Sequence, residues 1–221
     1  EPSESVSLLF QDPPELAAVD SAVADEWQRR LLSVVHSAKN EPVFLVPAHT
    51  TAIDLVDGDK EGSEYALADN LEYFRRHFDH IIIDTPGQLR NRMLRSALVA
   101  ADGVLIPVMP TPTVLISVSP LFKLIKDIKR GANRSLQIDG WLISNAGHRN
   151  DADALLTRRA LQETPGVYTF QTAIRTLKAI SRASALEVSV FGMENNEEAV
   201  RDYEAFLREW HERISQVAYG S

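Results

Sequence analysis

The chain has 221 residues, 44% hydrophobic and 24% charged, as in an ordinary globular domain, and no apolar run approaches the roughly 20 residues that span a bilayer. The absence of cysteine excludes disulfides, cysteine-ligated metal centres and a cysteine nucleophile. The net charge of −8 is unevenly distributed along the chain. Residues 1–70 carry 14 acids and 4 bases (−10), residues 71–182 carry 9 acids and 16 bases (+7), and residues 183–221 carry 8 acids and 3 bases (−5). A basic middle can attract a polyanion even in an acidic protein, although solvated helix faces would give the same pattern.

The first third of the chain predicts two helices and one strand. Glu1–Glu15 is polar and rich in Pro and Ser, which is typical of a loop, whereas Leu16–Ser37 has apolar residues at the three- and four-residue spacing of a helix. Pro42–Ala48 is a short apolar run between prolines and predicts a buried strand. The acidic segment Thr50–Gly62 predicts a loop, and Tyr65–His77 a second helix.

The centre of the chain carries the strongest strand signal. His80–Asp84 is apolar and β-branched, as expected of a strand buried on both faces, and the Thr-Pro-Gly that follows would end it. Leu89–Ala101 predicts a helix, and Gly103–Met109 is a second fully apolar strand candidate.

The rest of the chain continues the alternation. We expect a long amphipathic helix at Thr113–Arg130, a buried strand at Ile138–Ser144, and a helix at Asp151–Glu163 capped by Asn150 or Asp151. We then expect a strand at Val167–Phe170, a short helix or ordered loop at Ile174–Ala185, and a closing amphipathic helix at Glu194–Val217. In the last helix the spacing predicts that Phe206, Leu207 and Trp210 face the core.

Strands that alternate with helices favour an α/β fold with a mostly parallel sheet and helices on both faces. We expect residues 1–221 to form a single domain. Right-handed crossovers bring the carboxyl ends of the strands to one edge, where ligands of open α/β sheets bind. Three loops fall there: Asp84–Gln88, Met109–Thr113 and Asn145–Arg149.

Asp84 is the leading catalytic and metal-binding candidate. Four apolar residues followed by an acid form the Walker B pattern, in which a carboxylate at a strand end holds Mg²⁺ directly or through water. A strand-end Asp can also merely cap a turn. The next three residues, Thr85-Pro86-Gly87, favour a ligand-binding role for Asp84. Pro86 fixes the direction of the chain, and Gly87 lets its backbone N–H approach a phosphate closely.

Residues 80–108, HIIIDTPGQLRNRMLRSALVAADGVLIPV, resemble the ParA/MinD/Soj family of deviant Walker ATPases. The most specific match is the strand that ends in Asp-x-Pro and the later stretch AADGVLIPV. The resemblance extends over roughly residues 40–215. It implies a P-loop NTPase-like fold, ATP and Mg²⁺ as cofactors, and Asp84, Thr85, Pro86 and Gly87 at the nucleotide.

One family feature is missing from the sequence. The family's glycine-rich KGGxxK[ST] loop has no counterpart, since the chain has no Gly-Lys pair and no Lys followed by Ser or Thr. The chain is then either a piece of a longer protein, lacking the P-loop strand and helix, or a natural homologue that cannot hydrolyse ATP. The first is favoured, because a parallel sheet without its middle strand would leave backbone groups unpaired.

Further nucleotide contacts are expected on the same edge of the sheet. The resemblance implies that Asn145 contacts the adenine edge, where an amide can donate and accept together; a turn residue beside Gly147 is the alternative. Thr111 and Thr113 would line the nucleotide or a dimer face, unless their prolines only shape the loop.

Two groups of bases are candidates for DNA binding. Lys123, Lys126 and Arg130 share one helix face, and Arg175, Lys178 and Arg182 repeat at three and four residues. Partition members of the family bind DNA non-specifically with basic residues late in the chain, so the second group is the better match. Contacts of this kind need charge rather than sequence readout. A solvated face is the alternative for both groups.

The resemblance implies an ATPase for plasmid or chromosome partition, bacterial, cytoplasmic and nucleoid-associated. It would act as a homodimer on non-specific DNA with a ParB-like stimulating partner. The acidic segment Glu194–Glu212 argues against a membrane-targeting helix. The alternatives are a catalytically inactive adaptor of the same fold that binds a partner protein or DNA, and a related positioning or conjugation ATPase.

Overall fold

The computed structural model describes residues 10–11, 36–38, 44–45, 62–76, 78–85, 89, 92–147, 152–186 and 188–218. The chain divides into two compact units, Glu1–Ala100 and Ala101–Ser221. Several predictions lie outside the described residues. They are the loop over Thr50–Gly62, of which only Gly62 is described, the roles of Pro86 and Gly87, and the N-cap at Asn150 or Asp151.

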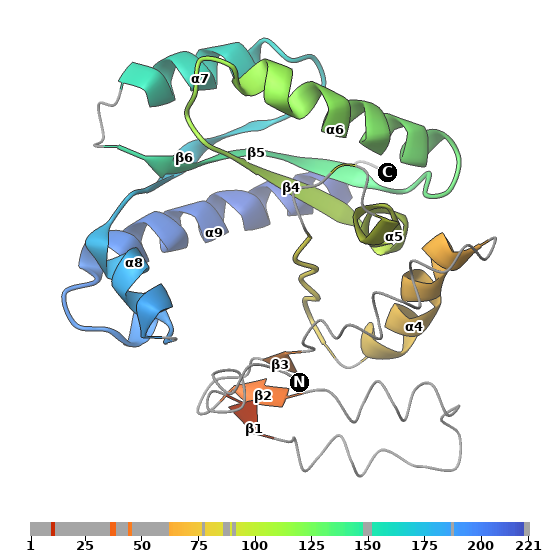
Figure 1. The fold of residues 1–221 in the computed structure, drawn as a ribbon, viewed down its shortest axis with the longest axis horizontal. Helices are drawn as coiled ribbons and strands as arrows, with labels where there is room; N and C mark the ends of the chain where they lie inside the picture. The colour runs from red at the N-terminus through yellow and green to blue at the C-terminus, as the bar shows by residue number, and fades with distance from the viewer. Residues whose placement is uncertain are drawn as a thin grey trace. The chain divides into compact units, whose positions relative to one another are not determined.

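The second unit is a three-layer α/β arrangement. Its sheet consists of β4 (Gly103–Val108), β5 (Gln137–Ala146) and β6 (Thr169–Arg175), in the order β4-β5-β6, and both pairs are parallel. One face of the sheet carries α6 (Val114–Arg130) and α7 (Ala152–Gln162), and the other carries α9 (Glu197–Ala218) (Figure 1). The predicted α/β fold with a parallel sheet and helices on both faces is confirmed.

One cluster of the core of the second unit lies between the sheet and α9, and the buried Ile125 and Ile128 of α6 belong to the other face. Leu142, Phe170, Ile174 and Phe206 form a buried cluster, against which Trp210 and other half-buried side chains pack. The aromatic rings of Phe170 and Phe206 meet edge to face at 5.2 Å. Burial of these apolar surfaces is what fixes α9 on the sheet.

The prediction that Leu207 faces the core is wrong, because 40% of this residue is exposed. The apolar stripe of α9 passes through Phe206 and Trp210, which lie four positions apart on one face. The position one residue after Phe206 turns away from that face by about 100°.

Two glycines explain how closely the strands approach their neighbours. Gly140 has φ +154°, and a Cβ there would lie 2.6 Å from the carbonyl oxygen of Tyr168. A Cβ at Gly103 would lie 2.5 Å from Oδ1 of Asp139, whose other oxygen accepts a hydrogen bond from Trp210 Nε1 at 2.9 Å. Gly140 must therefore be glycine for β5 to approach the backbone at Tyr168, whereas at Gly103 the end of the Asp139 side chain would have to shift.

The last part of the second unit differs from the prediction in its boundaries. β6 begins later than predicted and continues to Arg175, and α8 (Lys178–Ala185) begins only after it. The short 3-10 helix η3 (Val190–Gly192) precedes α9. Pairing with β5 extends β6, because residues 173–175 find partners along the last residues of β5.

In the first unit, α4 (Ala66–Phe74), preceded by the 3-10 helix η2 (Ser63–Tyr65), packs against α5 (Arg92–Ala100). Their predicted positions are confirmed. Phe74, Leu94 and Leu98 are buried. The side chain of Arg75 donates a 2.9 Å hydrogen bond to the last carbonyl of α5, at Ala100. This contact satisfies one of the carbonyls that a helix end leaves unpaired.

The first unit also holds a small antiparallel sheet of β1 (Phe10–Gln11), β2 (His36–Ala38) and β3 (Phe44–Leu45). The prediction of a loop is therefore wrong at Phe10–Gln11, and that of a helix is wrong at His36 and Ser37. Of the strand predicted over Pro42–Ala48, the structure describes Phe44–Leu45, which form a strand in an antiparallel pair. β2 and β3 are close in sequence, and such neighbours pair antiparallel through a short connection.

The strand predicted at His80–Asp84 is wrong, because these residues form no strand. Ile82 is 88% exposed and Ile81 38%, so the isoleucines are not buried on both faces. A strand exists through its ladder hydrogen bonds, and no described residue pairs with this segment. Composition alone therefore did not decide its state.

Candidate functional site

The parallel sheet of the second unit brings three chain segments to one edge. β4, β5 and β6 run in the same direction, so the loops that follow them lie together at their carboxyl ends. We call residues 109–113, 145–147 and 176 the rim. Thr111, Thr113 and Asn145, all predicted from sequence, belong to it.

Asn145 has an unusual backbone on the rim. Its φ is +56°, in the left-handed region that few residues other than glycine enter, although Asn is among the most tolerant. Its side chain is exposed, and its Oδ1 accepts a hydrogen bond from Oγ1 of Thr176 at 2.6 Å. Sequence reasoning found Asn145 but missed Thr176, which has no motif of its own.

Thr111 and Thr113 lie in the loop that leads into α6. The carbonyl of Thr111 accepts bonds from the backbone N–H of Val114 at 3.1 Å and from the hydroxyl of Thr157 on α7 at 3.5 Å. Thr113 is exposed and directly precedes α6, where its carbonyl accepts from the N–H of Ile116. The loop is thereby held between the first turn of α6 and the middle of α7.

Arg175, predicted as a DNA contact, takes part in an ion-pair network with two acidic residues of α9. Its Nε lies 2.8 Å from Oδ2 of Asp202 and its Nη1 lies 3.0 Å from Oε1 of Glu198. The hydrogen bonds that Arg175 donates to Asp202, and then those that it donates to Glu198, raise its pKa above the ordinary value despite the opposing effect of burial. With its guanidinium occupied, Arg175 fits a structural role better than a phosphate contact.

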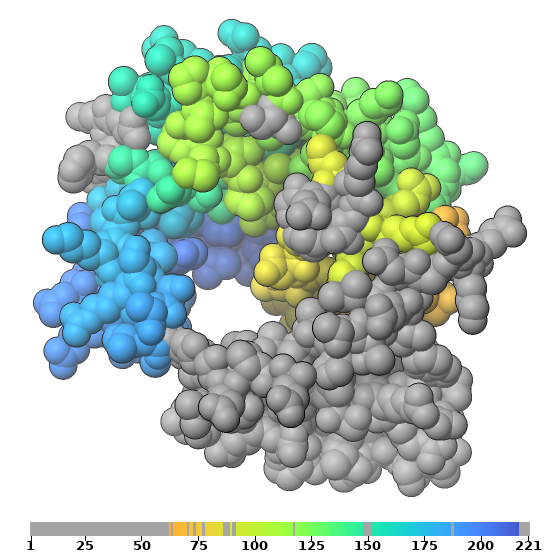
Figure 2. All heavy atoms as spheres, viewed as in Figure 1, coloured from red at the N-terminus to blue at the C-terminus, as the bar shows by residue number. Residues whose placement is uncertain are grey.

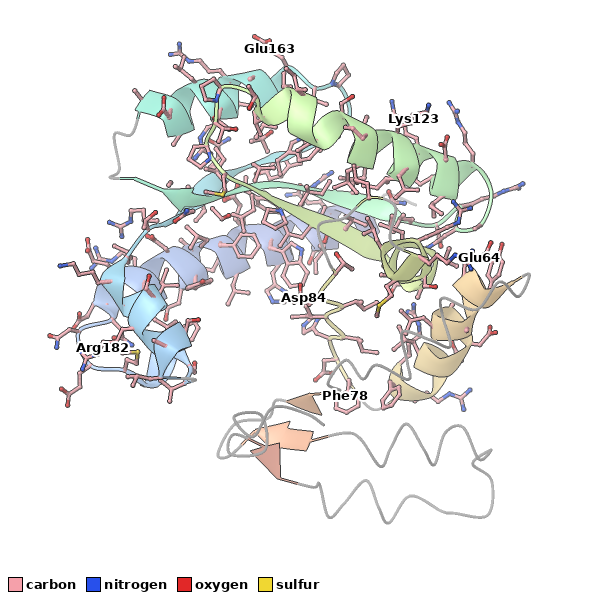
Figure 3. The ribbon with its side chains drawn as sticks, viewed as in Figure 1. Glu64, Phe78, Asp84, Lys123, Glu163 and Arg182 are labelled. Atoms are coloured by element: carbon pink, nitrogen blue, oxygen red, sulfur yellow. The ribbon has the colours of Figure 1, made fainter. Side chains whose placement is uncertain are left out.

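The other two bases of that group lie on a separate element. Arg175 ends β6, whereas Lys178 begins α8 and Arg182 follows one turn later, so the three do not share one helix face. Lys178 and Arg182 are exposed. The α8 region forms a lobe of the second unit (blue in Figure 2), and Arg182 lies on its surface (Figure 3).

The three bases of α6 lie within about two turns of one helix. Lys123, Lys126 and Arg130 are exposed, and Figure 3 shows Lys123 pointing away from the sheet. The ammonium of Lys126 lies 4.4 Å from the ring centre of Phe122, a cation–π contact. No described residue forms an ion pair with these three bases.

Asp84 and Thr85 belong to the first unit, at the end of the extended segment 78–85 (Figure 3). Asp84 is exposed and Thr85 is half-buried. Among the described residues, no group of three or more His, Asp or Glu side chains forms a metal cluster. A single exposed carboxylate fits a metal that takes its remaining ligands from water and phosphate, as Mg²⁺ does.

A hollow of about 300 Å³ lies beside β6 in the second unit, and its lining includes Arg158, Arg175, Arg201 and Asp202. Arg175 is paired with Asp202, and the guanidinium of Arg158 donates to the carbonyl of Phe170. Burial lowers the pKa of Arg158, although Glu209 opposes this effect. Internal partners therefore use most of the charge of this hollow, and the rim is the better candidate site.

No helix among the described residues has the length and hydrophobicity to cross a bilayer.

Comparison with known proteins places the chain in a family. The family model described as an AAA domain (AAA_31) matches residues 18–138, more than half of the chain. The chromosome partitioning protein ParA of Myxococcus xanthus is 29% identical over 144 residues, which cover 63% of this chain and 48% of that protein. The maintenance of carboxysome distribution protein A of Gloeobacter kilaueensis is 29% identical over 136 residues, 59% of this chain and 60% of that protein.

Solved structures share the fold. The apo McdA structure from Cyanothece superposes with a TM-score of 0.68 at 20% identity, over 82% of this chain and 72% of that one. A Borrelia burgdorferi plasmid partition protein bound to AMPPNP gives 0.61 at 19% identity, over 80% and 68%. Cobyrinic acid a,c-diamide synthase from Mycobacterium smegmatis with ADP and magnesium gives 0.60 at 20% identity, over 70% and 68%.

The parallel sheet with its rim, the match to the family model and these relatives together define the class of protein. The chain belongs to the AAA domain family and, within it, to the ParA/MinD-type deviant Walker ATPases. It spans about half the length of the curated relatives that it matches.

Proposed function

We propose that the chain is the greater part of a ParA-like partition ATPase. It binds ATP with Mg²⁺ as a homodimer, binds non-specific DNA of the nucleoid, and releases it when a ParB-like partner stimulates hydrolysis. The observation that carries the proposal is the position of Asn145, an exposed amide held at the carboxyl edge of a parallel sheet in a protein of this family. The ADP and magnesium named for the M. smegmatis structure support the choice of cofactors.

In this proposal residues 1–221 belong to one ATPase domain whose P-loop strand and helix lie upstream. The two edges of the sheet support this view. On β6, backbone N–H groups of Gln171 and Thr172 are occupied by Glu209 of α9, and that of Arg175 by Asp202. On β4, the described residues provide a partner strand on one side only. An open edge of this kind favours a further strand.

Asp84 is proposed to organise Mg²⁺ or the attacking water, with Gly87 at the γ-phosphate and Thr85 and Pro86 beside them. Magnesium would bridge phosphate oxygens and neutralise charge that develops during transfer. Asp84 would bind the ion through its carboxylate, and the protein's own contribution would be positioning and electrostatic stabilisation.

The homodimer is supported by exposed apolar side chains around the rim. Met109, Ile116, Leu155 and Leu156 are each more than half exposed, and they come from the rim and the first turns of α6 and α7. Where exposed apolar side chains form one patch, they mark an interaction site. A second copy that covered it would also enclose the nucleotide.

The test is ATP hydrolysis with and without the upstream segment. We expect no measurable ATPase activity from the 221-residue chain, and ATP hydrolysis in the presence of Mg²⁺ from the protein with its upstream segment restored. Asp84→Asn in the restored protein, which keeps the size of the side chain, should lower kcat at least 100-fold. Hydrolysis by the short chain would refute the proposed role of the missing loop.

A second candidate is a nucleotide-free adaptor that keeps the fold and binds a partner protein or DNA. The observation that favours it is the absence of any Gly-Lys pair. The coding sequence upstream of Glu1 separates the two: a KGGxxK[ST] segment supports the ATPase, and an unrelated sequence supports the adaptor. A positioning role other than partition is supported by the carboxysome distribution relative.

A further inference from the structure

The hollow of about 300 Å³ beside β6 lies at the edge of the sheet, and we call it the edge hollow. Its lining comes from β6 together with α7 and α9, which cover opposite faces of the sheet (Figure 1). Among its lining residues, Ala146 alone belongs to the rim. The volume is at the lower end of the range for small-molecule sites, so it admits a ligand of a few carbon atoms.

Small side chains create the space in the edge hollow. Four of its lining residues are alanines, one each from β5, α7, β6 and α9: Ala146, Ala154, Ala173 and Ala205. Leu155 of α7 adds an apolar side chain that is 52% exposed. The hollow therefore offers apolar surface to the carbon chain of a short ligand, as small-molecule sites usually do.

The charge that remains in the edge hollow belongs to two arginines. Arg201 of α9 is exposed, and no described residue forms an ion pair with it. Arg158 of α7 is half-buried and donates to the carbonyl of Phe170, a partner without formal charge. Burial lowers the pKa of Arg158, and Glu209 only opposes this effect. A bound anion would stabilise both guanidinium groups.

The acidic side chains nearest the hollow already have partners. Asp202 accepts from Nε, Nη2 and the backbone N–H of Arg175, and Glu209 accepts from the backbone N–H groups of Gln171 and Thr172. These bonds offset much of the negative charge. They also occupy backbone donors along the edge of β6 that an added strand would need. A small molecule therefore fits the hollow better than a β-strand of another protein.

We propose that the edge hollow binds a small organic acid, with its carboxylate or phosphate group between Arg158 and Arg201 and its carbon chain against the alanines and Leu155. A guanidinium is planar and presents its N–H groups as a fork that matches both kinds of oxyanion. The bond from Nη1 of Arg158 to the carbonyl of Phe170 orients this arginine before a ligand arrives. Arg201 supplies the second cation from the opposite face of the sheet.

The experiment titrates the full-length protein with succinate and with glycerol 3-phosphate by isothermal titration calorimetry. ADP and Mg²⁺ are present in excess, so that neither probe binds at the nucleotide site, and the ionic strength is held constant. We expect one saturable site per chain for at least one probe. Succinamide, which has the size of succinate without its charge, should not bind. The probe that binds more tightly identifies the anion as a carboxylate or a phosphate.

Arg201→Gln tests the site directly, because no described residue pairs with this exposed side chain. The affinity for the preferred probe should fall at least about tenfold, the worth of a hydrogen bond to a charged group. Arg208→Gln replaces another exposed base of α9 and is the matched control, which should keep the wild-type affinity. Ala154→Leu fills the hollow without a change of charge and should also weaken binding. Thermal unfolding of each variant shows whether the fold is kept.

Three results would overturn the proposal. The first is that wild type shows saturable binding of neither probe. The second is that succinamide binds as well as succinate, since the arginines would then play no part. The third is that Arg201→Gln keeps the wild-type affinity or loses no more of it than Arg208→Gln does, which would indicate general attraction to a basic surface. None of these readouts depends on ATP hydrolysis or on DNA binding.

Discussion

Single residues of this chain act through conformation and pairing more than through their chemical type. Asn145 is informative because its backbone is left-handed, and Arg175 because its charge is used inside the molecule. Neither property is visible in the sequence. A base at a favourable position along the chain is a DNA contact only when its charge reaches solvent.

The left-handed conformation of Asn145 predicts opposite effects for two small substitutions. Asn145→Ala should lower the free energy of unfolding by about 1 to 2 kcal/mol, because a Cβ without a local polar partner disfavours this conformation. Asn145→Gly, the matched control, also removes the amide but adopts positive φ freely, so its effect should be near zero. Urea denaturation measures both. Equal stabilities of the two variants would show that the backbone is not left-handed in solution.

At the scale of elements, α9 does more than cover the sheet. Its carboxylates close the outer edge of β6, where Glu209 accepts from the N–H groups of Gln171 and Thr172 and from the hydroxyl of Tyr168. Burial alone would raise the pKa of Glu209, but these hydrogen bonds lower it below its ordinary value. The helix therefore joins the strand through charge as well as through apolar packing.

The lowered pKa of Glu209 predicts how its contribution to stability depends on pH. A carboxyl whose folded pKa lies below its unfolded value of about 4.3 stabilises the fold above that value, and the effect disappears as pH falls through the folded pKa. Glu209→Gln should cost about 1 kcal/mol at pH 7, a value reduced for partial exposure. The difference from wild type should shrink below about pH 4. Denaturation curves at several pH values measure it, and a difference independent of pH would contradict the ionic contact.

For the whole molecule, total charge is a poor guide to what it attracts. The chain carries −8, yet α6 presents three exposed bases on one side of the second unit. Fields at distances beyond about 10 Å are screened at physiological salt, so a local patch decides contact with a polyanion. For this reason the bases of α6 are stronger candidates for DNA binding than the group of bases that includes Arg175.

Removing the bases of α6 should weaken salt-sensitive DNA binding. In the full-length protein with ATP, log affinity falls as log salt rises. Replacing Lys123, Lys126 and Arg130 by Ala should reduce the steepness of this fall by about 2 to 3, since each phosphate contact contributes about 0.9. Lys178→Ala with Arg182→Ala tests the α8 alternative in the same titration. Arg208→Ala removes an exposed base of α9 and is the control. If the α6 variant kept the wild-type salt dependence and the α8 variant showed a weaker one, the DNA interface would be assigned to α8.

The sequence by itself determined the order and type of most elements between residues 66 and 218, because their apolar periods are strong and local. It also pointed to the family through residues 80–108 and to Asn145 at a strand end. These inferences need only neighbouring residues along the chain.

Only the tertiary structure decided which apolar segments pair, which charges are free and how the polar groups of the rim are held. Ile81–Ile83 have the composition of a buried strand, but a strand requires partners that the segment itself cannot supply. Arg175 and Lys178 look alike in the sequence, and the carboxylates of α9, more than 20 residues away, make them different. Hydrogen bonds and ion pairs between distant segments depend on the folded chain, so no local pattern encodes them.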